Sequence, residues 1–261
     1  MITETVKTWK SAKDQILTAE VPKETRTYKP VSHQELIDLT LESIHQSGFE
    51  IASQSYISGR EGQVATGKYG ISSVQDSEMR LQIAWQNSYD KTTTLKFAIG
   101  AQVIVCENGM VSGDNGHFKT KHVGDVQTFA PAAITEYIKQ SGDSFKTMQN
   151  DREGLKAHEV SKERRAEILG RMFFNDNLIQ SSQMNVIRKE LLDPTHDYGC
   201  PDSLWELYNH STFAMKEIHP RIWMKDHIAL HEFFMAEVSS QHNIEVDKVF
   251  KESMMNQLEM F

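Results

Sequence analysis

The chain has 261 residues, of which 39% are hydrophobic and 25% charged, and its formal net charge is −8. This apolar content, with 4 Trp, 7 Tyr and 12 Phe, is typical of a folded globular protein and excludes a disordered chain. No stretch approaches the ~18–20 consecutive apolar residues of a membrane helix, and the first residues lack the apolar core of a signal peptide. We therefore expect a cytoplasmic protein without a membrane partner.

Residues 1–30 are polar and contain Pro22 and Pro30, which indicates an irregular N-terminal arm. The pattern changes at Ser32, which forms a capping box with Glu35 and begins a run of apolar residues at helical spacing. Gly48 is a natural end for this helix because glycine readily adopts the left-handed conformation of a helix C-terminus. The sequence thus predicts one helix before the region that follows.

From residue 49 to residue 113 the apolar period changes to two. Met79 to Trp85 and Leu95 to Val105 alternate apolar with polar or small residues, as strands with one buried face do. Two weaker segments, 49–58 and 63–72, precede them, and the Asn108-Gly109 pair predicts a tight turn after the last strand. These signals favour a four-stranded antiparallel meander.

Helical patterns take over beyond about residue 122. The predicted spans are 124–156, with breaks at Pro131 or Gly142, then 161–174, 176–192, 202–217 and 222–241. A run of strands followed by a run of helices indicates an α+β fold. We expect an arm at 1–30, a helix plus sheet at 31–125, and a helical region at 126–261 that packs on the sheet in one intertwined domain.

The charges are unevenly distributed between these regions. Residues 1–125 carry 13 Lys and Arg against 15 Asp and Glu, whereas residues 126–261 carry 15 against 21. The acidity excludes indiscriminate coating of nucleic acid but allows a local basic groove. On the polar face of the predicted sheet, cations and glutamines lie beside small residues, which suits an extended single strand. The alternative is that the C-terminal helices cover this face. The predicted nucleic-acid-binding residues are Lys68, Arg80, Tyr89, Lys96, Lys119 and Lys121, with Tyr89 as a base-stacking residue.

Catalytic and metal-binding motifs give weaker signals. The string Gly62 to Tyr69 fits a phosphate-binding loop except at its last position, where Tyr69 replaces the Ser or Thr that would hold magnesium. His227 and His231 are four residues apart on a predicted helix, so their imidazoles are candidate metal ligands. His227 also belongs to an apolar stripe, where a hydrogen-bonded core histidine is the simpler interpretation. We identify no catalytic residue and expect no cofactor.

Three ordered motifs resemble a family of uncharacterised phage- and plasmid-borne proteins. They are Asn87-Ser88-Tyr89-Asp90, the hairpin Cys106-Glu107-Asn108-Gly109, and the later element Trp205-Glu206-Leu207-Tyr208-Asn209. The resemblance covers residues 45 to 215 and implies a mobile-element origin and an α+β fold, but it supplies no activity. A buried Asn209 beside aromatic residues would need a hydrogen-bond partner.

The sequence therefore leads to a ranked set of functions. First is a phage or mobile-element protein of nucleic-acid metabolism that binds or anneals single-stranded DNA in recombination and assembles into a homo-oligomer. The alternatives are an anti-defence protein that sequesters a host protein or a nucleotide signal, and a metal-dependent hydrolase that uses His227 and His231.

Overall fold

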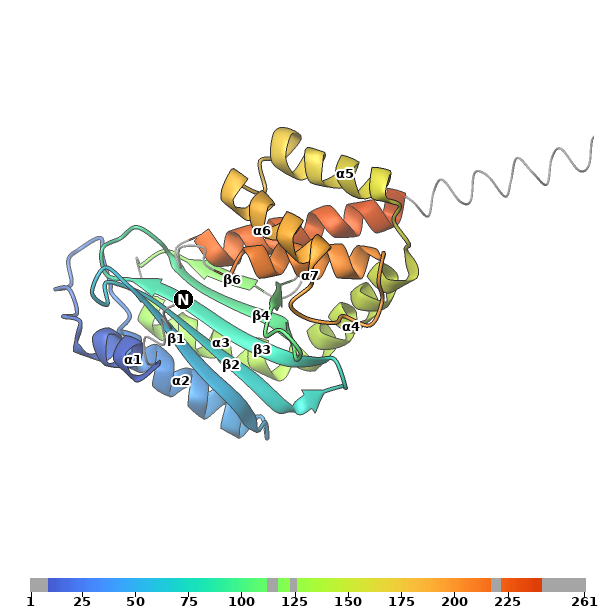
Figure 1. Ribbon diagram of the computed structural model, residues 1–261. Helices are drawn as coiled ribbons and strands as arrows, with labels where there is room; N and C mark the ends of the chain where they lie inside the picture. The colour runs from blue at the N-terminus through green and yellow to red at the C-terminus, as the bar shows by residue number, and fades with distance from the viewer. Residues whose placement is uncertain (1–8, 112–116, 123–125, 217–221, 241–261) are drawn as a thin grey trace, which may run out of the picture. The chain divides into compact units, whose positions relative to one another are not determined.

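The structure is a computed structural model that describes residues 9–111, 117–122, 126–216 and 222–240 (Figure 1). It divides into two compact units, and each consists of two separate stretches of chain. Unit 1 is Met1–Gln149 with Met215–Ile228, and unit 2 is Asn150–Ala214 with Ala229–Phe261. The division near residue 150 differs from the expected boundary after residue 125, because the helix that follows the sheet belongs with the sheet. Within the described ranges, no helix combines the length and the apolar character needed to cross a membrane.

Unit 1 contains a six-stranded antiparallel sheet. Strands β1 (Ile51–Gly59), β2 (Val64–Gln75), β3 (Met79–Ser88), β4 (Leu95–Val103) and β5 (Gly109–Val111) are neighbours in chain order, and β6 (His117–Thr120) also pairs with β4. The α+β prediction, with a helix, a meander and a helical second half, is confirmed. The two short strands β5 and β6 were not predicted, because three or four residues are too few to show a period of two.

Helices α1, α2 and α3 lie on one side of this sheet (Figure 1). α1 (Trp9–Thr18) corrects the expectation of an irregular arm over residues 1–30. α2 (His33–Gln46) begins with the predicted capping box between Ser32 and Glu35, and Gly48 follows it with a φ of +72°. The capping box and Gly48 therefore mark the two ends of α2, as the sequence predicted.

An aromatic cluster fills the sheet face that α2 covers. The Trp85 indole donates a hydrogen bond to the Tyr69 hydroxyl at 3.2 Å, and the Tyr56 hydroxyl donates to the same oxygen at 3.3 Å. Gly67 lies beneath the indole, where an added Cβ would come within 2.5 Å of the ring. The glycine in this strand therefore makes room for a fully buried tryptophan.

The remaining helices follow the sheet in the chain. They are α3 (Val126–Lys139), α4 (Ser141–Ala157), α5 (Lys162–Gly170), the π-helical turn η1 (Arg171–Asn175), α6 (Ser181–Leu192), α7 (Leu204–Ala214) and a last helix over residues 222–240. Pro131 lies inside α3 without ending it, and the break comes at residue 140. Residues up to 228 of the last helix belong to unit 1 and the later ones to unit 2.

Candidate nucleic-acid interface

One face of the sheet carries most of the cations predicted to bind phosphates. Because side chains alternate between the faces of a sheet, residues in register on neighbouring strands share a face. Gln86 of β3 is opposite Lys96 of β4, which is opposite Lys119 of β6. Arg80 is an even number of positions from Gln86, and Lys68 is opposite Ala84. We call this surface the cationic face. Its predicted cations are Lys68, Arg80, Lys96 and Lys119, and Lys121 is exposed just after β6.

Lysines gather at one end of the cationic face. Lys96 and Lys119 are directly opposite each other, an arrangement of like charges that destabilises a sheet. The Lys96 ammonium donates a hydrogen bond to the buried Gln86 Oε1 at 2.9 Å. Burial raises the pKa of nearby Asp226, whereas the charges of Lys225 and Lys96 act to lower it. The carboxylate of Asp226 therefore lies close enough to interact with the charge of Lys96 at this end.

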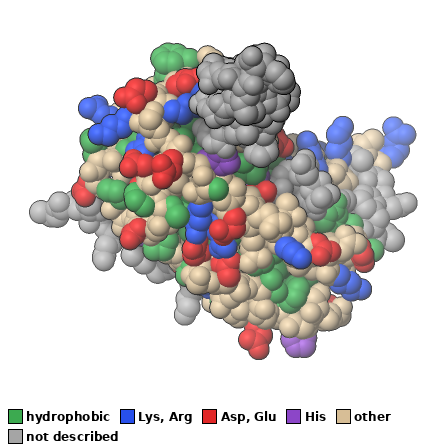
Figure 2. Space-filling model, turned by 90° about the vertical axis from the view of Figure 1, so that its right-hand side faces the viewer, with side chains coloured by type: hydrophobic (Ala, Val, Ile, Leu, Met, Phe, Trp, Pro, Cys, Tyr) green, Lys and Arg blue, Asp and Glu red, His purple; other side chains and the backbone are tan. Residues whose placement is uncertain are grey.

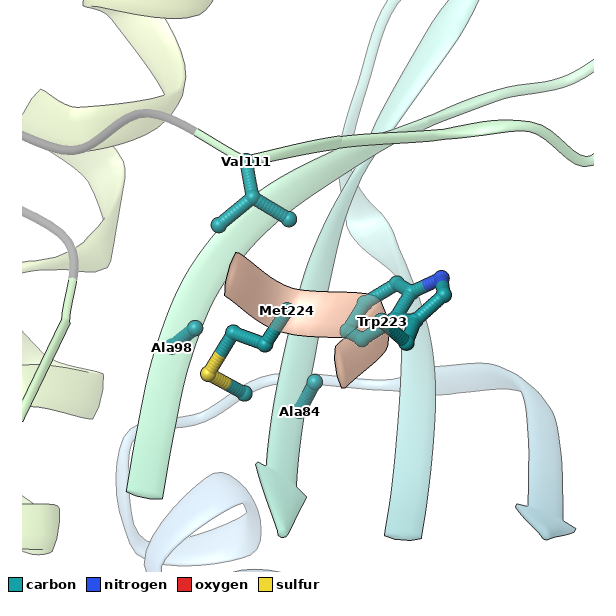
Figure 3. Close-up of a cluster of buried hydrophobic side chains, with 5 residues drawn as sticks. All are labelled: Ala84, Ala98, Val111, Trp223 and Met224. Atoms are coloured by element: carbon teal, nitrogen blue, oxygen red, sulfur yellow. The ribbon is translucent and has the colours of Figure 1, made fainter. Parts of the chain in front are cut away.

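The centre of the cationic face is covered. Trp223 and Met224, in the first turns of helix 222–240, pack on Ala84, Ala98 and Val111 (Figure 3). All five side chains are at most 4% exposed. The small residues of this face thus accommodate a helix of the same unit, so the face is closed at its centre.

Lys68 lies under this cover. Its Nζ is 3.7 Å from the centroid of the Trp223 ring, a cation–π contact. Burial lowers the pKa of Lys68 to about 7, because desolvation disfavours the charged form. Lys68 is therefore not an open phosphate contact in this structure, unlike Lys119.

The opposite end of the face is built around a glycine. A Cβ at Gly70 would approach Ser53 Oγ within 2.5 Å and Gln102 Oε1 within 2.8 Å. It would also lie 3.1 Å from Arg80 Cδ, so the glycine leaves room for three polar side chains. Arg80 is partly buried, and its Nε has no hydrogen-bond partner. The guanidinium thus retains an unused donor at this end.

Tyr89 does not fit its predicted role. It is 4% exposed, and its ring stacks on His33 with the centroids 3.8 Å apart. Its hydroxyl accepts a hydrogen bond from the His33 backbone N–H at 2.7 Å. A base needs an open ring face for stacking, so Tyr89 is a core residue in this structure.

The motif that contains Tyr89 fixes the connection between β3 and β4 to the start of α2. Asn87 Nδ2 donates to the Val31 carbonyl at 2.8 Å and contacts His33 Nδ1 at 3.1 Å. Ser88 Oγ donates to the Thr93 carbonyl. Asp90 accepts hydrogen bonds from Thr92 and Arg60, which lower its pKa against the effect of burial. All four motif residues therefore have structural roles.

We expect Asn87→Ala to destabilise unit 1 by about 1–3 kcal/mol, because it leaves the buried Val31 carbonyl and His33 Nδ1 without their donor. Urea unfolding followed by tryptophan fluorescence measures this change. Gln34→Ala, at an exposed position of α2, is the control. Equal midpoints for the two variants would show that the Asn87 bonds are not important for stability.

The second motif forms the turn between β4 and β5. The left-handed residue in this turn is Glu107, with a φ of 57°, and not the glycine of the Asn108-Gly109 pair. The Gly109 carbonyl is 3.0 Å from His227 Nδ1, and the Cys106 carbonyl accepts from Lys216 Nζ at 2.5 Å. The hairpin thus holds the C-terminal part of unit 1.

The third motif lies in α7 of unit 2, and its large side chains are buried. The Trp205 and Tyr208 rings are parallel, with centroids 5.9 Å apart. Asn209 Nδ2 donates to the Trp205 carbonyl at 2.9 Å, which supplies the partner that the sequence required. This motif also has a structural role.

The two candidate metal ligands face different groups. His227 contacts the Gly109 carbonyl, and His231 Nε2 is 3.2 Å from Asp151 Oδ2. In the part of the chain that the structure describes, no three or more His, Cys, Asp or Glu residues are placed to hold a metal ion. The geometry thus gives the metal-dependent alternative no support.

The covering of the face by Trp223 was not predicted from the sequence. Gln86, by contrast, is one of the glutamines that the sequence places on the polar face beside Lys96. The cation–π contact joins residues far apart in the chain, whereas the Lys96 hydrogen bond joins neighbouring strands of one hairpin. The one available signal was the run of small residues on the cationic face, which can accept a helix.

A comparison with family models bears on the chain as a whole. The model described as a domain of unknown function, DUF932, matches residues 23–219. The chain belongs to the DUF932 family. The resemblance to a family of unknown function is thereby confirmed, and no curated protein and no solved structure matches the chain. The DUF932 match includes the predicted cations and all three motifs, and it ends before Trp223 and His227.

Proposed function

We propose that this DUF932 protein binds single-stranded nucleic acid at the cationic face, in the nucleic-acid metabolism of a phage or plasmid. The observation that carries the proposal is the direct opposition of Lys96 and Lys119. Two cations in register on neighbouring strands project from the same face, so both can contact one stretch of a phosphate backbone. The exposed Lys121 extends the same cluster.

The remaining cations suggest a path for the strand. Arg80 is six residues from Gln86 along β3, which corresponds to about 20 Å at ~3.3 Å per residue. A strand that contacts both ends of the face would run along the edge of the cover, because Trp223 and Met224 occupy the centre. Lys68 and Tyr89 are outside this path.

The net charge of −8 opposes the approach of a polyanion and therefore limits the affinity that we expect. On the face shown in Figure 2, Lys and Arg side chains are interspersed with Asp and Glu. Such a mixed surface does not attract a polyanion over its whole extent, so binding would depend on a few local contacts. We therefore expect moderate affinity with strong salt dependence.

Fluorescence anisotropy with a labelled single-stranded oligonucleotide over a salt series tests the proposal. For the double variant Lys96→Gln with Lys119→Gln, we expect affinity at low salt to fall by about tenfold or more. The slope of log K against log salt should decrease by about 1.4, or ~0.7 for each lost phosphate contact. We expect Arg80→Gln, as a single substitution, to weaken binding as well.

The matched control is Lys139→Gln with Lys146→Gln, which removes the same charge from exposed positions on α3 and α4. If binding depends on the cationic face, this control keeps the affinity and slope of the native protein. If the two double variants lost affinity equally, the change in net charge would explain the loss, and the cationic face would not. Absence of binding at low salt would refute the proposal.

A further inference from the structure

Four strands of unit 1 bring polar side chains together over one glycine of the cationic face. Gly70 of β2 is in register with Ser53 of β1, and Arg80 of β3 is in register with Gln102 of β4. A Cβ on Gly70 would lie 2.5 Å from Ser53 Oγ and 2.8 Å from Gln102 Oε1. It would lie 3.1 Å from Arg80 Cδ. The side chains of Ser53, Arg80 and Gln102 therefore converge on one point above Gly70, and we call this group the polar notch.

The polar groups of the notch are unpaired and accessible. Among the described residues, Ser53, Arg80 and Gln102 form no side-chain hydrogen bond and no ion pair. All three are partly exposed. Of their polar side-chain atoms, Arg80 Nε is the one that is buried without a partner. The Arg80 Nη atoms, the Ser53 hydroxyl and the Gln102 amide therefore reach the solvent with unused hydrogen-bonding capacity.

The glycine serves the side chains above it. Gly70 is not among the residues with a positive φ, so its backbone conformation is one that alanine could adopt. A methyl group at this position would instead displace the ends of three polar side chains. A glycine inside a strand is typical of a place where another group approaches the backbone closely.

The notch combines hydrogen-bond donors with acceptors. The Arg80 guanidinium only donates, the Gln102 amide has a carbonyl oxygen and an NH₂ group, and the Ser53 hydroxyl can donate or accept. A phosphate only accepts, so it would leave the Gln102 carbonyl oxygen without a donor. The edge of a nucleobase carries both kinds of group. The polar notch therefore suits a base better than it suits a backbone phosphate.

We propose that the polar notch binds a guanine of the single strand on the cationic face, an inference that rests on the proposed function. Guanine presents two acceptors, O6 and N7, which an arginine contacts with two N–H groups at once. Its N1–H and N2 amine are donors for Gln102 Oε1 and Ser53 Oγ. Unpaired bases expose these edges in a single strand. Arg80 thus determines which base is bound, whereas Lys96 and Lys119 contact phosphates that carry no sequence information.

Fluorescence anisotropy with two labelled strands tests this inference. One strand is oligothymidine, and the other has a single guanine in place of a thymine. We expect the full chain to bind the guanine strand about tenfold more tightly, in the range for one bidentate arginine–guanine contact. A strand with 7-deazaguanine, in which C–H replaces N7, should lose most of this preference. Arg80→Lys keeps the charge without the planar fork, so it should lose the preference as well.

Gly70→Ala tests the polar notch without removing any polar group. Its methyl occupies the point where the three side chains converge, so we expect equal affinity for the two strands. Its affinity for oligothymidine should stay that of the native protein. Gly142→Ala is the matched control, because a Cβ there meets nothing within 4 Å, and it should keep the guanine preference. Urea unfolding checks that each variant is folded.

Equal affinity of the native chain for the two strands would overturn the inference, as would a guanine preference that survives in folded Gly70→Ala and Arg80→Lys. An equal loss for both strands in Gly70→Ala would also overturn it, because the notch would then contact a phosphate. All three results leave the proposed function intact. Lys96→Gln with Lys119→Gln should weaken both strands by the same factor and keep the preference. Absence of binding by either strand refutes the proposed function and, with it, the guanine site.

Discussion

Replacing Arg164 and Arg171 together with methionine is expected to lower the free energy of unfolding of unit 2 by about 3–5 kcal/mol. Both guanidinium groups form ion pairs with the carboxylate of Glu237, a residue that is 1% exposed. Arg164 Nη2 is 2.6 Å from Glu237 Oε2, and Arg171 Nη1 donates to Oε1. Without both arginines a buried carboxylate is left uncompensated, which is the costly way to break a buried ion pair.

Urea unfolding measures the effect of this double substitution. The control, Arg188→Met with Lys189→Met, removes the same charge from exposed positions on α6. It should change the unfolding free energy by less than about 1 kcal/mol, in the range usual for surface sites. Equal unfolding midpoints for the two double variants would show that the Glu237 cluster does not stabilise unit 2.

Lys68→Met is expected to have the opposite effect and to stabilise unit 1 by about 1–4 kcal/mol at pH 6, because each unit by which burial lowers the pKa corresponds to about 1.4 kcal/mol. Below pH 7 the lysine is charged in both the folded and the unfolded chain, and folding removes that charge from water. Methionine fills the same space without a charge.

The stability gained in Lys68→Met depends on pH, because the pKa of Lys68 differs between the folded and the unfolded chain. The folded pKa of Lys68 is about 7 and the ordinary value is 10.5, so between these pH values the unfolded chain binds more protons. The stability of the native protein relative to Lys68→Met therefore rises with pH across this window. Urea midpoints at pH 6, 8 and 10 should converge, with Lys146→Met as the exposed control. A constant difference would show that the Lys68 ammonium is not desolvated.

The sequence was a good guide to the fold where segments are long and periodic. The Ser32–Glu35 capping box, the alternation along β3 and β4 and the helix over residues 222–240 all follow from local pattern. It failed where segments are short: β5 and β6 have too few residues for periodicity, and α1 lies in a polar stretch. Nothing in the sequence pattern indicated that α3 belongs to the same unit as the sheet.

The candidate site was harder to predict because its contacts link distant parts of the chain. Local pattern indicates which residues share a strand face, so the grouping of Arg80 with Lys96 could be anticipated. It does not indicate that Trp223 covers Lys68, or that Tyr89 is buried against His33. Those contacts depend on which elements pack together, and one sequence without homologues gives little information about that.

Photo-cross-linking shows which residues of the protein a bound single strand contacts. A single-stranded oligonucleotide that carries photoreactive thymines is irradiated with the full chain at low salt, and the cross-linked peptides are mapped by mass spectrometry. If a single strand lies on the cationic face, cross-links form in β3, β4 and residues 117–122, and they are lost in Lys96→Gln with Lys119→Gln. Cross-links confined to α2 and α3, on the opposite side of the sheet, or no cross-links at all, would contradict binding at this face.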